Sequence, residues 1–301
     1  MENMKKQMTC FVCLGLAVVS LGGIEPAATV DFSAGKGAVK RLNGVCNPPP
    51  LGTVRSDWYR ETFGALDVAG IRFHDVTYAN PGLALVDISR IFPLPHADAD
   101  DPRNYRFGPT DDYIAYCREF TNEIEFRIGE QIEHYKSHYR VFPPKDYAKW
   151  ARICEHIIRH YNECWDNGYR LNIRYWEIWN EPDLRDDPSI HNETWTGTRI
   201  QFFDFYETVA KHLKKCFPSL RIGGPSLARS VDYAEAFLSE MGKRNVPLDF
   251  FSWHIYAGYP EKLTIKAGKY RALLDAYGYE KTESILNEYN YVNDWQLGYV
   301  R

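Results

Sequence analysis

The sequence predicts an α/β protein, most of an eight-stranded (β/α)8 barrel that is truncated after its seventh strand. Two features favour this fold class. Seven short apolar runs alternate with stretches of helical periodicity, which is typical of a parallel sheet with crossover helices. No internal repeat, low-complexity run or glycine-serine linker interrupts this alternation. A doubly wound open sheet is the alternative, but the chain contains no Gly-x-Gly-x-x-Gly turn or phosphate loop to support it.

Each expected strand is a short apolar run that ends at a turn or at polar residues. Three prolines, Pro48 to Pro50, follow the first strand. Pro182 ends the fourth strand, because proline cannot donate to a sheet ladder. In sequence order, the expected strands cover residues 39–45, 71–75, 123–128, 171–179, 220–223, 249–256 and 284–288.

Helices are expected between these strands. Gly70 follows the first helix in the position that favours glycine. Apolar residues recur at helical spacing from Tyr147 to Tyr161. A long segment rich in Pro, Asp and Asn, 77–110, is expected in the wall of a cleft, because long loops in compact domains are usually functional. The expected helices cover residues 57–68, 111–120, 146–165, 199–216, 231–244 and 265–277.

The composition is that of an ordinary soluble globular protein. Of its 301 residues, 45% are hydrophobic and 25% are charged. A formal net charge of −4 gives no reason to expect nucleic acid or an anionic membrane as a partner. Aromatic residues, at 15%, suit a cleft that stacks on sugar rings, although large cores use them as well.

The first 28 residues have the pattern of a secretory signal peptide. Two lysines precede an apolar run over residues 8–22, and small residues follow through Ala28. We therefore expect cleavage between Gly22 and Ala28, and a mature protein that is secreted or periplasmic and has no membrane span. An amino-terminal anchor helix is the alternative. Residues 29–301 are interpreted as one barrel domain, incomplete at its carboxyl terminus.

The cysteines and histidines form no recognisable metal-binding pattern. Five of the seven cysteines remain after processing, and these lack Cys-x-x-Cys spacing. The nine histidines include no His-Glu-x-x-His or comparable spacing. We therefore expect neither a metal nor a cofactor, and the sequence does not indicate the oligomeric state.

Two glutamates stand at the carboxyl ends of expected strands. The fourth strand stops at Asn180-Glu181-Pro182, and the seventh runs from Ile285-Leu286 into Asn287-Glu288. Such strand ends face each other across a barrel mouth, where partial desolvation raises the pKa of a carboxylic acid. Glycoside hydrolysis with retention of configuration needs a carboxyl pair separated by about 5 Å. The alternative is a pair of unrelated surface glutamates.

These residues resemble the motifs of clan A glycoside hydrolases. Trp179-Asn180-Glu181-Pro182 and Glu288, about a hundred residues apart, are similar to the two glutamates of that clan. Within the clan, the chain most resembles glycoside hydrolase family 39, the family of β-xylosidases and α-L-iduronidases, from about Gly44 onward. Further matching stretches are Ile71 to His74 and Ser252 to Tyr256. The resemblance implies a TIM barrel, a retaining glycosidase and a carbohydrate substrate.

The resemblance also implies roles for individual residues. Glu181 would be the general acid/base, Glu288 the nucleophile, and Asn180 a hydrogen-bond partner of the sugar 2-hydroxyl. Glu177 is interpreted as a buried structural carboxylate paired with an arginine. The expected activity is β-xylosidase-like exo action on polysaccharide fragments. The alternatives are another clan A activity (arabinofuranosidase, iduronidase or endo-xylanase) and a non-catalytic carbohydrate-binding barrel.

Strand alternation supports a cluster of substrate-binding residues around Glu288. Arg72 and His74 are two residues apart and point to the same side of the second strand, where Arg72 can hold Glu288 ionised. By the same alternation, His254 and Tyr256 share one face of the sixth strand near the nucleophile. For the arginine and the two histidines, a structural ion pair or a satisfied core position is the alternative.

The chain departs from the family pattern at its carboxyl end. It stops at Arg301, thirteen residues after Glu288, which leaves no room for an eighth strand and helix. An open barrel exposes unpaired strand edges. We therefore expect either a fragment of a longer protein or a barrel whose gap is covered by something else.

Overall fold

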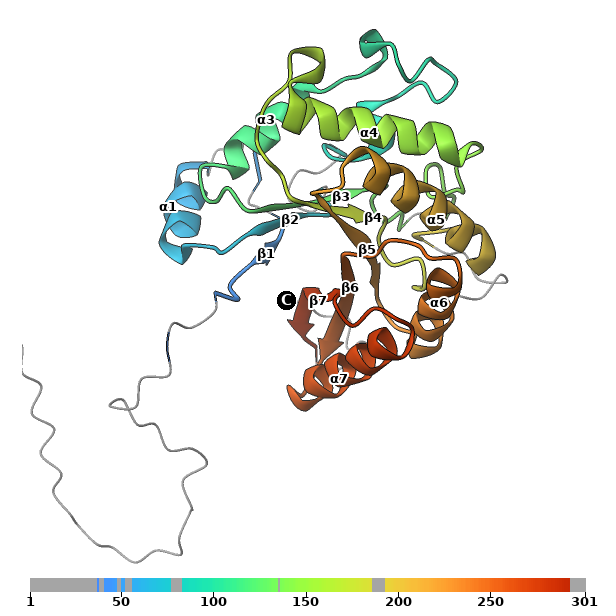
Figure 1. Ribbon diagram of the computed structural model, residues 1–301. Helices are drawn as coiled ribbons and strands as arrows, with labels where there is room; N and C mark the ends of the chain where they lie inside the picture. Colours follow the sequence, from blue (N-terminus) through green and yellow to red (C-terminus); the bar gives the residue numbers. More distant parts are fainter. Residues whose placement is uncertain are drawn as a thin grey trace, which may run out of the picture. The chain divides into compact units, whose positions relative to one another are not determined.

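The computed structural model describes residues 37, 41–47, 50–51, 56–76, 83–134, 136–185 and 193–292 (Figure 1). The chain divides into residues 1–40, of which only Gly37 is described, and one compact unit from Arg41 to Arg301. The predicted signal peptide therefore lies outside the described residues. In the part of the chain that is described, no helix is long and apolar enough to cross a membrane.

Seven parallel strands form one curved sheet, as the strand–helix alternation predicts. Each strand pairs with the next along the chain, which is the order of a (β/α) barrel. β1 and β7 approach each other, and no pairing joins them within the described residues, so the barrel is nearly closed. The strands are β1 Val45–Cys46, β2 Ile71–Phe73, β3 Ile124–Ile128, β4 Tyr175–Ile178, β5 Arg221–Leu227, β6 Phe250–Ala257 and β7 Glu283–Tyr291.

Helices between consecutive strands cover the outer face of the sheet (Figure 1). Several begin at side chains that accept hydrogen bonds from the first turn, such as Asp146 before α4 and Thr198 before α5. The helices are α1 Ser56–Leu66, α2 Ile88–Ile91, α3 Gly108–Cys117, α4 Tyr147–Glu163, α5 Arg199–Cys216, α6 Val231–Lys243 and α7 Glu261–Ala276. Short 3₁₀ turns cover Pro102–Asn104 and Trp165–Asn167.

The predicted strands and helices are confirmed, with differences at their ends. β1 is shorter than expected, because only Val45 and Cys46 pair with β2. β5 continues beyond Gly223 to Leu227, although a Gly-Gly-Pro run normally ends a strand, and its pairing with β6 is irregular between Gly224 and Leu227. These differences leave the order of the elements unchanged.

The described part of the long segment, residues 83–110, packs into the core instead of lining a cleft. Leu85 and Ile91 are buried, and the buried carboxylate of Asp87 pairs with Arg127 at 3.0 Å and with Arg140 at 2.8 Å. None of its described residues lines the cavity at the barrel mouth. The expectation of a cleft wall was wrong for these residues, because their apolar side chains and ion pairs anchor them beside β3.

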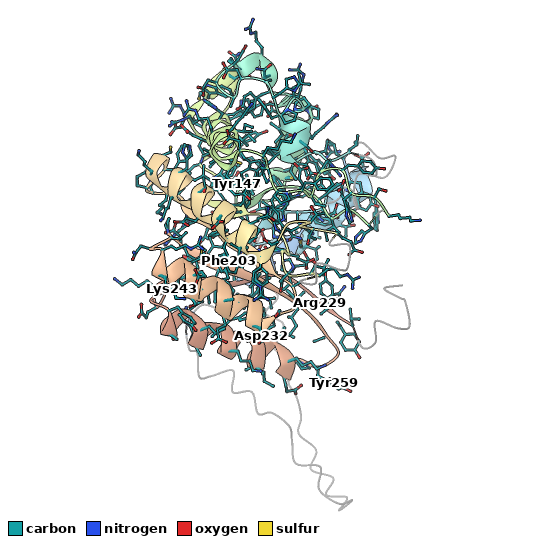
Figure 2. The ribbon with its side chains drawn as sticks, turned by 90° about the vertical axis from the view of Figure 1, so that its right-hand side faces the viewer. Tyr147, Phe203, Arg229, Asp232, Lys243 and Tyr259 are labelled. Atoms are coloured by element: carbon teal, nitrogen blue, oxygen red, sulfur yellow. The ribbon has the colours of Figure 1, made fainter. Side chains whose placement is uncertain are left out.

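Much of the aromatic content also belongs to the core. Trp179, at the end of β4, is buried and makes edge-to-face contacts with Trp195 (ring centroids 5.2 Å apart) and Phe205 (5.5 Å). Further along, Phe203, labelled on α5 in Figure 2, packs against Tyr233 of α6, with ring centroids 5.6 Å apart. The aromatic cluster therefore supports the end of β4 from outside the barrel.

The close approach of β5 and β6 gives a test of this packing. A Cβ atom at Gly223 would overlap the carbonyl oxygen of Phe250 and contact its ring at 2.5 Å. We expect Gly223→Ala to destabilise the protein by roughly 1–3 kcal/mol, the usual cost of overpacking. Gly268→Ala is the matched control, because a Cβ atom there meets nothing within 4 Å and alanine favours a helix by about 1 kcal/mol.

Both variants are compared with the unaltered protein by thermal unfolding, followed by circular dichroism. The melting temperature should fall for Gly223→Ala and stay equal or rise for Gly268→Ala. A Gly223→Ala protein that melts as high as the unaltered one would contradict the packing.

Candidate active site

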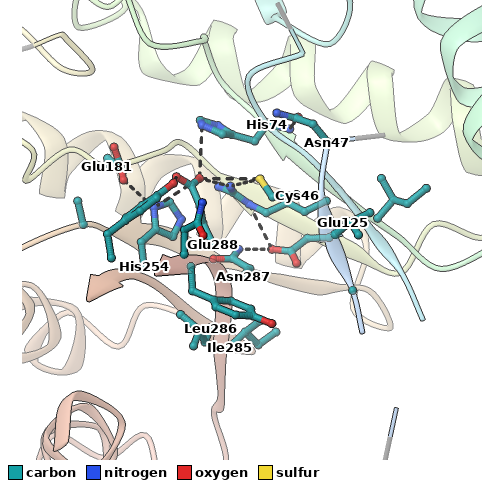
Figure 3. Close-up of a pocket in the computed structure, with 18 of the residues that line it drawn as sticks. Cys46, Asn47, His74, Glu125, Glu181, His254, Ile285, Leu286, Asn287 and Glu288 are labelled. Atoms are coloured by element: carbon teal, nitrogen blue, oxygen red, sulfur yellow. Dashed lines mark hydrogen bonds and ion pairs between the residues drawn. The ribbon is translucent and has the colours of Figure 1, made fainter. Parts of the chain in front are cut away.

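A cavity of about 1840 Å³ opens at the carboxyl ends of the strands and extends along the gap between β1 and β7 (Figure 3). Six of the seven predicted site residues line it: Arg72, His74, Glu181, His254, Tyr256 and Glu288. The seventh, Asn180, lies beside it and accepts a hydrogen bond from Arg72. The structure thus brings all the predicted site residues together at one end of the barrel.

Glu181 follows β4 on an unusual backbone. Trp179 and Glu181 have positive φ angles of 71° and 48°, and such conformations cost non-glycine residues roughly 1–3 kcal/mol each. Two backbone hydrogen bonds hold the turn, from Trp179 N to Ile128 O (2.9 Å) and from Glu181 N to Ser226 O (3.1 Å). Neighbouring strands on both sides therefore fix the carboxyl group in the cavity wall.

Glu288, on β7, contacts five side chains, one of which is the Cys46 thiol, with Sγ 3.8 Å from Oε2 (Figure 3). Its Oε2 atom lies 3.2 Å from Arg72 Nη1, 3.5 Å from His74 Nε2 and 3.7 Å from His254 Nδ1. Its Oε1 atom accepts a hydrogen bond from the Tyr256 hydroxyl at 2.5 Å. These contacts are those of a carboxylate held ionised.

The carboxyl groups of Glu181 and Glu288 face each other across the barrel mouth. One oxygen of each lies within 4.8 Å of the other. His254 stands between them, with Nδ1 2.7 Å from Glu181 Oε1. A closest oxygen–oxygen separation within 4.8 Å is compatible with the roughly 5–5.5 Å between the carboxyl groups of retaining glycosidases.

The two carboxyl groups have pKa shifts of opposite sign. Burial raises the pKa of Glu181 above its ordinary value, and the charge of Glu288 adds to this, against a hydrogen bond with His254 that lowers it. Burial would raise the pKa of Glu288 too, but His254, His74, Arg72 and the Tyr256 hydrogen bond together hold it well below its ordinary range. Over a range of pH, Glu181 is therefore an acid while Glu288 is an anion.

Arg72 connects Glu288 to the interior of the barrel. Its buried guanidinium contacts Glu177 Oε2 through Nε (2.7 Å) and Nη2 (2.6 Å), and it donates to Asn180 Oδ1 at 2.8 Å. The predicted contact with Glu288 is confirmed. Glu177 is also a buried carboxylate paired with an arginine, as the sequence predicts. Since a guanidinium stays protonated in proteins, Arg72 supplies the permanent positive charge of the site.

Buried polar atoms beside the two carboxyl groups are available to a ligand. Among the described residues, His74 Nδ1, Asn180 Nδ2 and His254 Nε2 have no hydrogen-bond partner. Burial lowers the pKa of His74 well below its ordinary value, so its imidazole is neutral in neutral solution. A polyhydroxylated ligand can pair with such donors and acceptors.

Four interior residues near the site were missed in the sequence: Cys46, Glu125, Ser226 and Asn287. The side-chain amide of Asn287 donates to Glu125 and to Glu177, both at 2.7 Å. Burial, with the nearby charge of Glu177, raises the pKa of Glu125 to about 8. A signal was present, because Glu125 and Arg127 alternate with apolar residues along β3 and must share one face.

Two groups of described side chains offer ligand atoms close enough for a metal ion: Glu181, His254 and Glu288, and Glu155, His212 and Cys216. In the first group, the guanidinium of Arg72 beside Glu288 opposes a further cation. In the second, two arginines already pair with the oxygens of Glu155, at 2.7 and 2.8 Å. Neither group favours a metal.

Comparison with known proteins agrees with this geometry. The curated relatives include a beta-xylosidase of Caldicellulosiruptor saccharolyticus, 34% identical over 249 residues, which cover 76% of this chain and 46% of that protein. A beta-xylosidase of Geobacillus stearothermophilus is 34% identical over 131 residues, 42% of this chain and 24% of the relative. The chain thus spans about half or less of the length of these relatives.

Solved structures resemble the fold. A glucosidase from Croceicoccus marinus has a TM-score of 0.70 at 27% identity, covering 85% of this chain and 53% of that one. A GH39 beta-xylosidase from Caulobacter crescentus has a TM-score of 0.57 at 18% identity, covering 83% and 53%, and supports the fold alone. The model of "Glycosyl hydrolases family 39" matches residues 82–282, more than half of the sequence. The chain therefore belongs to glycosyl hydrolase family 39.

Proposed function

We propose that this chain carries the catalytic barrel of a retaining glycoside hydrolase, with Glu181 as general acid/base and Glu288 as nucleophile. The observation that carries the proposal is the carboxyl pair itself. One oxygen of each group lies within 4.8 Å of the other, and the pKa of one group is raised while that of the other is lowered. Double displacement needs one protonated and one ionised carboxyl group at such a distance. No step in it requires a metal or a cofactor.

The two steps use the same pair of groups in turn. In the first, a Glu288 oxygen attacks the anomeric carbon, the glycosidic C–O bond breaks, and Glu181 gives its proton to the leaving oxygen. In the second, the ionised Glu181 takes a proton from water, the water oxygen attacks the anomeric carbon, and the bond to Glu288 breaks. The sugar leaves with its original anomeric configuration, and both carboxyl groups return to their starting states.

His254 suits both protonation states of Glu181. With the imidazole proton on Nδ1, it donates to the ionised carboxylate across 2.7 Å, and with the proton on Nε2, it accepts from the protonated acid. The same contact therefore holds Glu181 in place through both steps. This supports a role for His254 in the substrate-binding group rather than as a core histidine.

Asn180 is proposed to bind the 2-hydroxyl of the sugar beside Glu288. Its Oδ1 atom is occupied by Arg72 at 2.8 Å, while its buried Nδ2 atom has no partner among the described residues. The amide orientation is thus fixed, with the donor left for the substrate. A contact that strengthens as positive charge develops on the sugar ring lowers the barrier. His74 and Tyr256 complete the proposed sugar-binding surface.

The substrate that the relatives support best is a β-xyloside, cleaved by exo action on polysaccharide fragments. Both curated relatives quoted above are named beta-xylosidases. The name of the Croceicoccus marinus structure makes glucosides the first comparison substrate. From the pattern of residues 1–28 we also propose that the protein is secreted or periplasmic, which fractionation of cells producing the full chain would test.

Removing the nucleophile should abolish turnover. We expect Glu288→Ala to lose at least about 10⁴-fold in kcat on an aryl β-xyloside, because no covalent intermediate can form. Glu280→Ala, an exposed glutamate, is the matched control and should keep its activity. Full activity of Glu288→Ala would refute the assignment. If the folded, unaltered chain binds sugar but hydrolyses no aryl glycoside, a non-catalytic carbohydrate-binding barrel is the better explanation.

Removing the acid/base should give a different pattern. We expect Glu181→Ala to lose about 10²–10⁴-fold on substrates with poor leaving groups and less on activated ones, because only the former need protonation. Azide should restore turnover by replacing the activated water, and the product should be a β-glycosyl azide detected by NMR. An inverted azide product would assign Glu181 as the nucleophile instead.

The Tyr256 hydrogen bond should set the acid limb of the pH profile. Glu288 must be ionised to attack, so kcat/KM falls as the pH drops through its pKa. A hydrogen bond to a charged group contributes about 1.5–3 kcal/mol, so Tyr256→Phe should raise this pKa and move the acid limb to higher pH. Tyr259→Phe, at an exposed tyrosine, is the control. An acid limb that does not move would show that Tyr256 does not stabilise the ionised carboxylate.

Product analysis tests the substrate. Release of xylose alone from xylo-oligosaccharides, and faster cleavage of aryl β-xylosides than of β-glucosides or α-arabinofuranosides, is the expected result. Faster cleavage of the glucoside, or release of internal fragments, would replace the β-xylosidase assignment and leave the retaining mechanism intact.

A further inference from the structure

β7 is irregular at the position of the proposed nucleophile. Leu286 pairs with Trp253 of β6, and Glu288 pairs with His254, so Asn287 is an extra residue without a partner on β6. Such a β-bulge interrupts the alternation of side chains and re-aims them. As a result, two consecutive side chains, those of Asn287 and Glu288, both point into the barrel (Figure 3).

The side-chain amide of Asn287 forms hydrogen bonds inside the barrel with residues of β3 and β4. Its Nδ2 atom donates to Glu125 Oε1 on β3 and to Glu177 Oε1 on β4, each at 2.7 Å. Both amide protons therefore have acceptors. The Oδ1 atom of Asn287 is buried and has no partner among the described residues. The side chain is thus used as a donor, a role that an aspartate at this position could not fill beside two carboxyl groups.

These contacts close a ring of interactions that includes the proposed nucleophile. Asn287 binds Glu177 Oε1, Glu177 Oε2 binds Arg72, and Arg72 Nη1 lies 3.2 Å from Glu288 Oε2. The peptide bond between Asn287 and Glu288 completes the ring. The position of the bulge and the position of the carboxylate are therefore coupled through the buried Arg72–Glu177 pair.

Within the described sheet, the hydrogen bonds that hold this part of β7 lie along one edge of the strand. Among the described strands, β7 is hydrogen-bonded only to β6, although β1 lies close by. A strand paired along one edge has half the lateral hydrogen bonds of a central strand. The amide contacts across the barrel supply a restraint from the opposite direction.

We infer that Asn287 is a positioning residue for Glu288: its two hydrogen bonds to Glu125 and Glu177 hold the bulge that aims the carboxylate at the anomeric carbon. This rests on the proposed function of Glu288. A nucleophile displaced by about 1 Å can lose about 10²-fold in rate. Loss of the two Asn287 hydrogen bonds should therefore slow the chemical step more than it weakens substrate binding.

The test measures formation of the covalent glycosyl-enzyme. The full chain is mixed with 2,4-dinitrophenyl 2-deoxy-2-fluoro-β-xyloside, and the release of dinitrophenol and the mass of the protein are followed with time. We expect Asn287→Leu, close in size and without donors, to form the adduct about 10²-fold more slowly, with KM changed only a few-fold. Asn122→Leu, at an exposed asparagine on the turn before β3, is the matched control.

Three further variants separate positioning from a general loss of stability. Glu125→Gln keeps an acceptor for the Asn287 amide and should be slowed less than Glu125→Leu, which removes it. Asn287→Thr keeps one donor and should lie between the unaltered protein and Asn287→Leu, and it replaces Asn287→Leu if that variant does not fold. The inference is supported if the rate of adduct formation falls from the unaltered protein to Asn287→Thr to Asn287→Leu, and if Glu125→Gln is faster than Glu125→Leu. The variants should have similar melting temperatures and KM values.

Adduct formation by a folded Asn287→Leu or Asn287→Thr within about threefold of the unaltered rate would overturn the inference but leave the role of Glu288 intact. The proposed function is checked separately, by the unaltered chain. If that chain forms no adduct, or if peptide mapping finds the sugar on a residue other than Glu288, the proposed function fails and the inference fails with it.

Discussion

The site depends on one buried positive charge, the guanidinium of Arg72. A buried cation is costly unless it is paired and hydrogen-bonded, and removal of one partner from such a group typically costs several kcal/mol. Here the guanidinium has acceptors on three other strands or strand ends: Glu177 and Asn180, Ser226, and Glu288. Because the charge must be compensated, these side chains converge on one point, and the barrel mouth acquires its geometry from that requirement.

The same charge favours the ionised form of two carboxyl groups in the barrel, Glu177 and Glu288. Burial would raise the pKa of Glu177, but Arg72 and hydrogen bonds from Ser226 and Ser252 lower it, and His254, His74 and Arg72 together lower the pKa of Glu288. One guanidinium thus stands between two ionised carboxylates. For Glu125 and Glu181, burial outweighs the nearby groups that lower the pKa, and the pKa of both is raised. The protonated state that the proposed acid needs therefore follows mainly from the burial of Glu181, with a smaller contribution from the charge of Glu288.

Residue patterns along single strands were enough to predict the barrel order and most of the site. Alternation placed Arg72 and His74 on one face, and the run into Glu288 marked a strand end. What sequence could not supply was any feature that depends on pairing between distant segments. The bulge at Asn287 exists only in the register of β7 against β6, and its contact with Glu125 joins residues 162 positions apart. The packing of residues 83–110 depends likewise on Arg127 and Arg140.

The coupling between the two carboxyl groups also explains how one residue can serve as acid and then as base. The negative charge of Glu288 is among the causes that raise the pKa of Glu181, after burial. In the covalent intermediate of the proposed mechanism, that charge is lost, because the Glu288 oxygen is bonded to the sugar. The pKa of Glu181 then falls, which favours the ionised form at the moment when water must be activated. Release of the sugar restores the charge on Glu288, and with it the affinity of Glu181 for a proton. A separation within 4.8 Å between one oxygen of each group is close enough for this exchange, since charges interact strongly at such a distance in a partly desolvated cavity.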